Sequence, residues 1–249
     1  MVSVVDLFSI GIGPSSSHTV GPMRAALAFM DSLDAHPHTV EVELRGSLAA
    51  TGVGHGTDRA VLLGLAGYTP TTTTTDIAPK PGEPIPERGT ISGPRGQLEY
   101  IIHLEPTPVA EHPNCVIFSA WDESGAQLAI NQAYFSVGGG FIVDREEFSH
   151  LDGDDNASAA GTDNANVEVP LPFLTAAELL RHCADQEMSI AEVMRVNEEA
   201  LHGTDELNNH LDAVWNVMQE CVARGLKTDG VLPGGLNVKR RAHRLHRLL

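Results

Sequence analysis

The chain has 249 residues, and its 33 acidic side chains against 16 basic ones give a formal net charge of −17. With 42% hydrophobic and 20% charged residues, this composition is typical of a globular chain with its own core and excludes a disordered or fibrous protein. So negative a charge argues against nucleic acid as a partner, because phosphate contacts need a basic face.

Several other classes are excluded by local patterns. No run of about 18 apolar residues predicts a span of a membrane. The first residues lack the basic region of a secretory signal. Three cysteines without a CxxC pair exclude a disulfide scaffold and disfavour a zinc ribbon. We therefore expect a cytoplasmic protein that does not contact membranes.

Residues 1–148 predict a mixed α and β domain. Apolar side chains with helical spacing or with strict alternation mark the elements. The expected helices are 21–34 and 57–66, and the expected strands are 40–45, 97–104, 114–121 and 126–136. The stretch 76–96 follows five threonines and is rich in Pro and Gly, so it is expected to be a loop.

Residues 149–170 are small and polar, which predicts a flexible acidic linker between two domains. Residues 171–249 are expected to be helical. Capping boxes begin two helices at Thr175 and Ser189. A third helix is expected from Asp205 to Gly225, and a fourth from after Gly235 to Leu249. The fold class is therefore α+β, with a mixed α/β-sheet domain followed by a partial all-helical domain.

The densest polar cluster is the segment 13–22, GPSSSHTVGP, directly before a predicted helix. A helix N-terminus and nearby hydroxyl groups together favour binding of a carboxylate or phosphate. The candidate binding residues are Ser15, Ser16, Ser17, His18 and Thr19. The alternative is a serine-rich turn with one capping hydroxyl. The segment lacks the glycine and lysine patterns of dinucleotide and P-loop sites.

A second cluster, GVGHGTD over 52–58, places His55 among three glycines before the helix 57–66. A neutral imidazole is a natural proton acceptor, and Asp58 could orient it. A flexible surface loop with an ordinary histidine is the alternative. Gly138 and Gly139 end a strand, which indicates close backbone packing against a ligand or a simple turn. Lys239 lies at the start of the fourth predicted helix, where a carboxylate or solvent would face it.

The cysteines fall into apolar patterns. Cys115 lies in a predicted strand, and Cys183 and Cys221 lie on helical stripes, so we expect three core residues and no ligands. The other histidines form no metal spacing. No metal site is predicted.

Four motifs in order resemble the bacterial iron–sulfur-dependent L-serine dehydratases. They are IGIGPSSSHTVGPM over 10–23, GHGTD over 54–58, GGGF over 138–141 and LPGGL over 232–236. The resemblance implies a β domain before the linker and the start of a helical α domain after it. It implies conversion of L-serine to pyruvate and ammonia, a [4Fe–4S] cluster in the full-length protein and a homodimer. The β domain also resembles a regulatory domain of phosphoglycerate dehydrogenase.

Carried onto this sequence, the resemblance makes His55 the candidate base, with His18 and Ser17 as further catalytic residues. The residues that would bind the substrate are Ser15, Ser16, Ser17, His18, Thr19, Asp58, Gly138, Gly139 and Lys239. The family's cluster cysteines lie beyond the LPGGL motif, where this chain has none. We therefore expect no cluster and no activity from this chain alone, and a C-terminal α-domain half as its partner.

Three other interpretations remain open at this point. The first is a non-catalytic module in which the segment 13–22 binds serine or a small anion for regulation. The second is a small iron–sulfur protein that uses the three cysteines. The third is an interaction protein that acts through the basic C-terminal helix.

Overall fold

The computed structural model describes the chain except for residues 1–2, 9, 75–76, 78–84, 152–167 and 233–236. Contacts divide the chain into two compact units. We call them the sheet unit, Gly11–Ala160 with Asp229–Arg241, and the helical unit, Met1–Ile10 with Gly161–Thr228 and Ala242–Leu249. A mixed sheet with helices and a mainly helical second part confirm the expected fold class.

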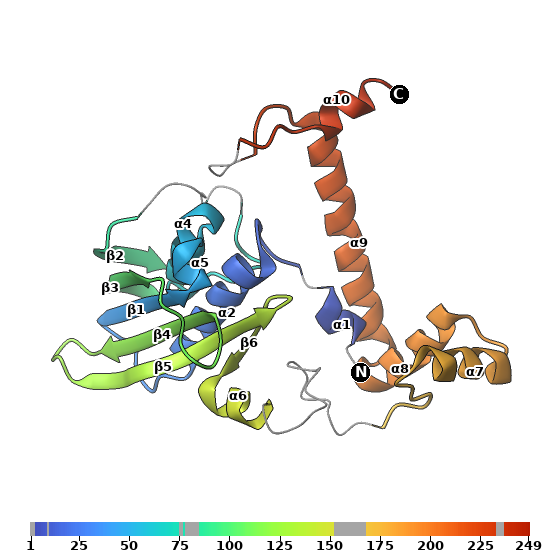
Figure 1. The fold of residues 1–249 in the computed structure, drawn as a ribbon, viewed down its shortest axis with the longest axis horizontal. Helices are drawn as coiled ribbons and strands as arrows, with labels where there is room; N and C mark the ends of the chain where they lie inside the picture. The colour runs from blue at the N-terminus through green and yellow to red at the C-terminus, as the bar shows by residue number, and fades with distance from the viewer. Residues whose placement is uncertain (1–2, 9, 75–76, 78–84, 152–167, 233–236) are drawn as a thin grey trace. The chain divides into compact units, whose positions relative to one another are not determined.

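The sheet unit is built on six strands in the order β2-β3-β1-β4-β5-β6 (Figure 1). Only β1 and β3 pair in parallel; the other pairs are antiparallel. The strands are β1 Thr39–Gly46, β2 Arg88–Gly93, β3 Gly96–Glu105, β4 Asn114–Trp121, β5 Gln127–Gly138 and β6 Phe141–Asp144. The expected strands 40–45, 97–104, 114–121 and 126–136 are confirmed within two residues.

Two helices, α2 (Gly21–Asp31) and α5 (Thr57–Leu65), pack against one face of this sheet. Every second side chain of β1 is buried, as the alternating pattern predicted. Phe29 of α2 stacks on Phe118 of β4 with ring centroids 4.7 Å apart. This core fixes the ends of β1 and α2, from which the candidate site is built.

The expected loop over 76–96 is wrong for its last part, because 88–93 forms the edge strand β2. Gly93 pairs with Gly96 across a tight turn, and Gly96 has φ +106°, which glycine adopts readily. The edge strand buries little, so its composition carries no apolar alternation. Residues 75–76 and 78–84 of the same expectation lie outside the described residues.

The described part of the helical unit consists of helices of different lengths. They are α1 Val4–Leu7, α7 Ala176–Gln186, α8 Ile190–His202, α9 Thr204–Lys227 and α10 Ala242–His246. Both capping boxes are confirmed: the Thr175 and Ser189 hydroxyl groups accept from the third helical amide, and Glu178 and Glu192 accept from the cap amides. In the described part of the chain, no helix combines the length and apolarity that crossing a membrane requires.

The predicted third helix, Asp205 to Gly225, is confirmed within two residues as α9, although Gly225 does not end it. The prediction of the fourth helix is wrong. The fourth helix is replaced by an antiparallel bridge between Val231 and Lys239, followed by the short α10. The backbone bonds from Leu232 N to Val238 O and from Arg240 N to Gly230 O hold this hairpin. Residues 233–236 of the LPGGL motif lie outside the described residues, as do 152–167 of the predicted linker.

The cysteine expectation holds for Cys115, which is fully buried, and burial raises the pKa of its thiol to about 12. It is wrong for Cys221, which is exposed on α9, and Cys183 is only partly buried. The reason is that Leu207 is the single fully buried side chain among the described residues of α9. The apolar stripe of this helix is present, but the described helical unit leaves it largely exposed.

Candidate active site

The candidate site forms where two segments of the sheet unit meet. The first is a turn of π-helix, Ser16–Val20, which leads directly into α2. The second follows β1 and contains α3 (Ser47–Ala50) and α4 (Gly52–His55) before α5 begins. Gly46 between β1 and α3 has φ +59°, and a side chain there would overlap the Pro113 carbonyl oxygen. Glycine is therefore required at the bend that presents Ser47.

We call Ser15 and the π-helical turn Ser16–Val20 together the serine turn, and its three serines have different roles. The Ser15 hydroxyl caps the turn by accepting from the His18 amide at 3.1 Å. The Ser17 hydroxyl bonds the Nδ1 atom of His18 at 2.9 Å. Ser16 is exposed, and its hydroxyl makes no hydrogen bond within the described part of the chain. Ser16 is therefore the serine whose hydroxyl remains available to a ligand.

Both ring nitrogens of His18 are bonded to hydroxyl groups. Ser17 bonds Nδ1, and the Ser47 hydroxyl lies 2.9 Å from Nε2. Partial burial lowers the pKa of His18, and the neighbouring His55 lowers it further. The ring is therefore held in one orientation and favoured in its neutral form.

The His55 ring lies beside His18, with ring centroids 5.0 Å apart and planes at 37°. Its Nδ1 atom is 3.0 Å from the carbonyl oxygen of Thr51. Because a carbonyl oxygen only accepts, Nδ1 carries the proton and the neutral ring has its lone pair on Nε2. No group of the described chain bonds Nε2, so this nitrogen can accept a proton from a ligand.

Two threonines tie the segments together. The buried Thr19 hydroxyl donates to the carbonyl oxygen of His55 at 3.0 Å and accepts from the Ser15 amide at 3.3 Å. The Thr57 hydroxyl donates to the carbonyl oxygen of His18 at 2.5 Å. With its hydroxyl used twice inside the protein, Thr19 positions the two histidines and does not face a ligand.

Asp58 does not orient His55. The hydrogen bond at His55 Nδ1 comes from Thr51, and the buried Asp58 carboxylate accepts instead from the Arg59 amide at 2.8 Å. Gly56 has φ +64° and redirects the chain between α4 and α5. Asp58 then lines an open cleft of about 680 Å³ whose acidic members also include Glu41, Glu43, Glu87 and Glu105. Burial raises the pKa of Asp58, against the opposing effect of the Arg59 amide and charge.

The other predicted site residues are Gly138, Gly139 and Lys239. Gly138 ends β5 and Gly139 follows it, close in the chain to Ser136, whose hydroxyl donates to the carbonyl oxygen of Ser17 at 2.7 Å. The two glycines are therefore close to the serine turn. Lys239 is exposed where it forms the bridge with Val231, and no contact of the described chain joins its side chain to either histidine.

Ser47, Thr51 and Ser136 were not predicted as site residues. Ser47 and Thr51 contact the histidines directly, and Ser136 holds the serine turn. A signal existed only for Ser47, which follows a glycine at the end of a strand and begins a helix. For Ser136, no local pattern marks a hydroxyl that bonds a residue 119 positions away.

Gly21 is expected to be essential for the geometry of the serine turn. A Cβ at Gly21 would overlap the Ser136 hydroxyl, which is bonded to Ser17. We expect Gly21→Ala to lower the free energy of unfolding of the sheet unit by about 1–3 kcal/mol through overpacking. Denaturant unfolding measures the change. Gly54→Ala is the matched control, because a Cβ there meets nothing within 4 Å, and an equal effect of both variants would contradict this account.

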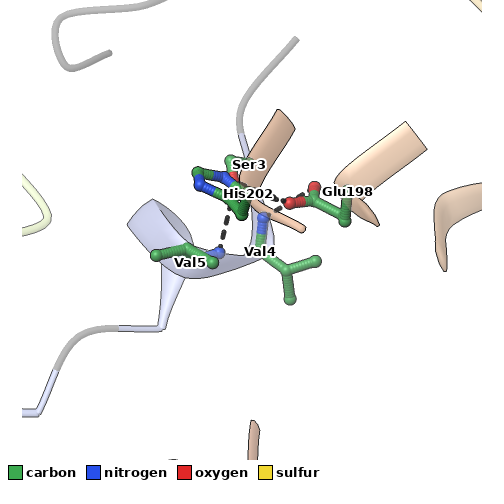
Figure 2. Close-up of polar contacts among 5 residues, drawn as sticks. All are labelled: Ser3, Val4, Val5, Glu198 and His202. Atoms are coloured by element: carbon green, nitrogen blue, oxygen red, sulfur yellow. Dashed lines mark hydrogen bonds and ion pairs between the residues drawn. The ribbon is translucent and has the colours of Figure 1, made fainter. Parts of the chain in front are cut away.

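A second polar cluster, in the helical unit, contains serine, histidine and glutamate (Figure 2). The Ser3 hydroxyl donates to Glu198 at 2.6 Å, accepts from the Val5 amide at 3.1 Å and lies 2.9 Å from His202 Nε2. In a nucleophilic triad, the serine proton goes to histidine. Here it goes to the buried Glu198, which also accepts from the Val4 amide. The cluster therefore caps α1 and does not activate Ser3 as a nucleophile.

The described residues do not fit an iron–sulfur cluster. Such a cluster is usually held by three or four thiolates. Cys115 is buried in β4 of the sheet unit, whereas Cys183 and Cys221 lie on two different helices of the helical unit. Within the described ranges, no group of three or more His, Cys, Asp or Glu residues is placed to hold a metal ion.

Two models of known protein families match most of this chain. The family model "Serine dehydratase beta chain" matches residues 3–147. This chain belongs to the serine dehydratase family. The model "Serine dehydratase alpha chain" matches residues 185–249. The expected family resemblance is therefore confirmed.

Three curated members of the serine dehydratase family illustrate the likeness. L-serine dehydratase 2 of Escherichia coli K12 is 41% identical over all of this chain and 54% of its own length. L-serine dehydratase of Streptomyces coelicolor is 42% identical over 97% of this chain and 53% of its own. That of Helicobacter pylori is 33% identical over 96% and 52%. The chain thus spans about half the length of the curated relatives it matches.

Proposed function

We propose that this chain supplies the substrate-binding and proton-abstracting part of an L-serine dehydratase, which converts L-serine to pyruvate and ammonia. The observation that carries the proposal is the pair of imidazole rings, His18 and His55, held 5.0 Å apart at the serine turn. The curated relatives, named L-serine dehydratases, support the choice of substrate.

The serine turn would bind the carboxylate of L-serine. Its first backbone N–H groups and the Ser16 hydroxyl are suitable donors, because the start of a helix favours negative charge. The hydroxyl groups of Ser17 and Ser47 hold His18 beside it. We keep the backbone of Gly138 and Gly139 as a further contact of the ligand. We leave Asp58 and Lys239 out of the site, because no contact brings them to the histidines.

His55 would act as the base. Its Nε2 lone pair takes the α-proton of L-serine, and the electrons of that C–H bond form the Cα–Cβ double bond as the β-carbon loses hydroxide. The products of this step are aminoacrylate, hydroxide and protonated His55; the hydroxide takes up one proton to become water, which balances the proton that His55 gained. The imine tautomer of aminoacrylate is then hydrolysed by water to pyruvate and ammonia. We assign no group of the described chain to the departure of the hydroxide.

A second function begins with the same binding step. A regulatory module would bind serine or a small anion at the serine turn without any proton transfer. The His55 tautomer favours the enzyme, because a lone pair on Nε2 next to the serine turn is suited to accept a proton. The two functions differ in the effect of His55 on turnover and not in its effect on binding.

Binding of L-serine to this chain tests the proposal directly. We expect saturable binding in isothermal titration, weakened about tenfold or more by Ser16→Ala, because a lost hydrogen bond to a charged group costs about 1.5–3 kcal/mol. Ser149→Ala, in the exposed helix α6 (Arg145–Leu151), is the control. Absence of L-serine binding, or equal binding by Ser16→Ala, would remove the serine turn from the site.

A further inference from the structure

Helix α9 carries an apolar face that is open to solvent. Leu211, Trp215, Met218 and Val222 repeat at intervals of 4, 3 and 4 residues, which places them on one side of an α-helix. Their exposed fractions are 38%, 61%, 44% and 61%. We call these four residues the α9 stripe. Leu245 of α10, which packs against α9, is also 61% exposed.

The described helical unit does not bury a core of its own around this stripe. Of its described hydrophobic side chains, only Val193 and Leu207 are almost completely buried. Leu207 belongs to the first turn of α9, so the remaining 20 residues of the helix bury no side chain in this way. A helix with one continuous apolar face is stable in a globular protein when another element covers that face.

The comparisons indicate which element that is. The alpha-chain model matches 185–249, a range that contains the whole α9 stripe. The matched segment is 54% of the length of L-serine dehydratase 2, so this relative carries almost as much chain again outside the match. We propose that the α9 stripe is the docking surface for this further part of the family's alpha chain. The inference rests on the proposed function, because a further part of the alpha chain is a partner only if this chain acts in an L-serine dehydratase.

The size of the stripe argues against a second copy of the chain as the occupant. A stable interface between two proteins buries about 800 Å² on each side. Four partly exposed side chains on one helix offer much less than this. A chain segment that continues the same helical domain can cover the stripe as an ordinary core contact, because the entropy of association is then small.

Co-expression tests the docking surface. The full 249-residue chain with an affinity tag is produced together with the region of E. coli L-serine dehydratase 2 that lies outside the match. We expect the tagged chain to retain this region in equal amounts. Trp215→Glu places a charge in the stripe and should reduce recovery at least tenfold. Asn216→Glu adds the same charge about 100° around α9 from Trp215, outside the stripe, and should leave recovery unchanged.

Trp215 also reports on its own environment. In a Trp121→Phe background, Trp215 is the only tryptophan, and we expect its fluorescence to be quenched by iodide in the chain alone and protected in the complex. Circular dichroism of Trp215→Glu shows whether its helices still form. The apolar variant Trp215→Leu should recover as much of the partner region as the unchanged chain does.

Four results would overturn the inference. They are no retention of the partner region, equal retention by Trp215→Glu, a dimer of the chain alone that Trp215→Glu dissociates, and protection of Trp215 in the monomeric chain, which would assign the stripe to the sheet unit. Pyruvate formation is measured separately. A complex that depends on the stripe but forms no pyruvate would contradict only the proposed function, and pyruvate formation independent of the stripe would contradict only the docking surface.

Discussion

Replacing His55 with alanine is expected to slow pyruvate formation from L-serine by about 10²–10⁴-fold, the usual contribution of a general base. The physical reason is the orientation of the ring: the Thr51 carbonyl oxygen binds Nδ1–H and leaves the lone pair on Nε2. The assay uses this chain co-expressed with the remaining region of a curated relative, under anaerobic conditions. L-serine affinity should stay within a few fold of wild type, because the serine turn binds the carboxylate.

His103→Ala is the matched control for this prediction. His103 is an exposed histidine of β3 that pairs with Glu41 at 3.0 Å, outside the serine turn. Its replacement should leave turnover unchanged. If His55→Ala keeps wild-type turnover while L-serine still binds, His55 is not the base and the regulatory module becomes the better interpretation of the serine turn.

Replacing Phe118 with alanine is expected to reduce the free energy of unfolding of the sheet unit by about 3–5 kcal/mol. Phe118 is fully buried between Phe29, on which it stacks, and Tyr134, which meets it edge-on at 6.0 Å. The loss combines the transfer of a large ring to water with the cavity that remains. Whole domains are stable by only about 5–15 kcal/mol, so this single change removes a large part of the total.

Denaturant unfolding followed by far-UV circular dichroism measures the Phe118→Ala change. Ile130→Ala is the control on the same sheet, because Ile130 of β5 is 50% exposed and should cost less than about 0.5 kcal/mol. L-serine binding by Phe118→Ala should weaken only under conditions where the sheet unit unfolds. A loss equal to that of the control would show that the two helices are not held by this core.

Features that depend on neighbouring residues in the chain were predictable. The capping boxes at Thr175 and Ser189 are confirmed, because a hydroxyl and a carboxylate three positions apart meet whenever a helix begins there. The alternation of β1 is confirmed for the same local reason. The segments 13–22 and 52–58 were predicted as candidate sites, and the structure brings them together at the histidine pair.

The composition of single segments misled the prediction in two places. The edge strand β2 has too little burial to leave an apolar pattern, so its Pro- and Gly-rich surroundings predicted a loop. The residues 236–249 have helical spacing, but the hairpin bonds of Leu232 and Arg240 take the backbone out of a helix. In both cases, backbone pairing with a nearby segment of the chain outweighs local propensity.

The sequence by itself determined the family, the mixed sheet followed by helices, and which residues are candidates for the site, since motifs and periodicity lie within short stretches of chain. Only the tertiary structure decided what surrounds those residues. The structure bonds His18 to Ser47 and His55 to Thr51. It places Asp58 in the wall of an acidic cleft and leaves the α9 stripe exposed. Hydrogen-bond partners and burial depend on what other segments place beside a side chain, and no local pattern contains that information.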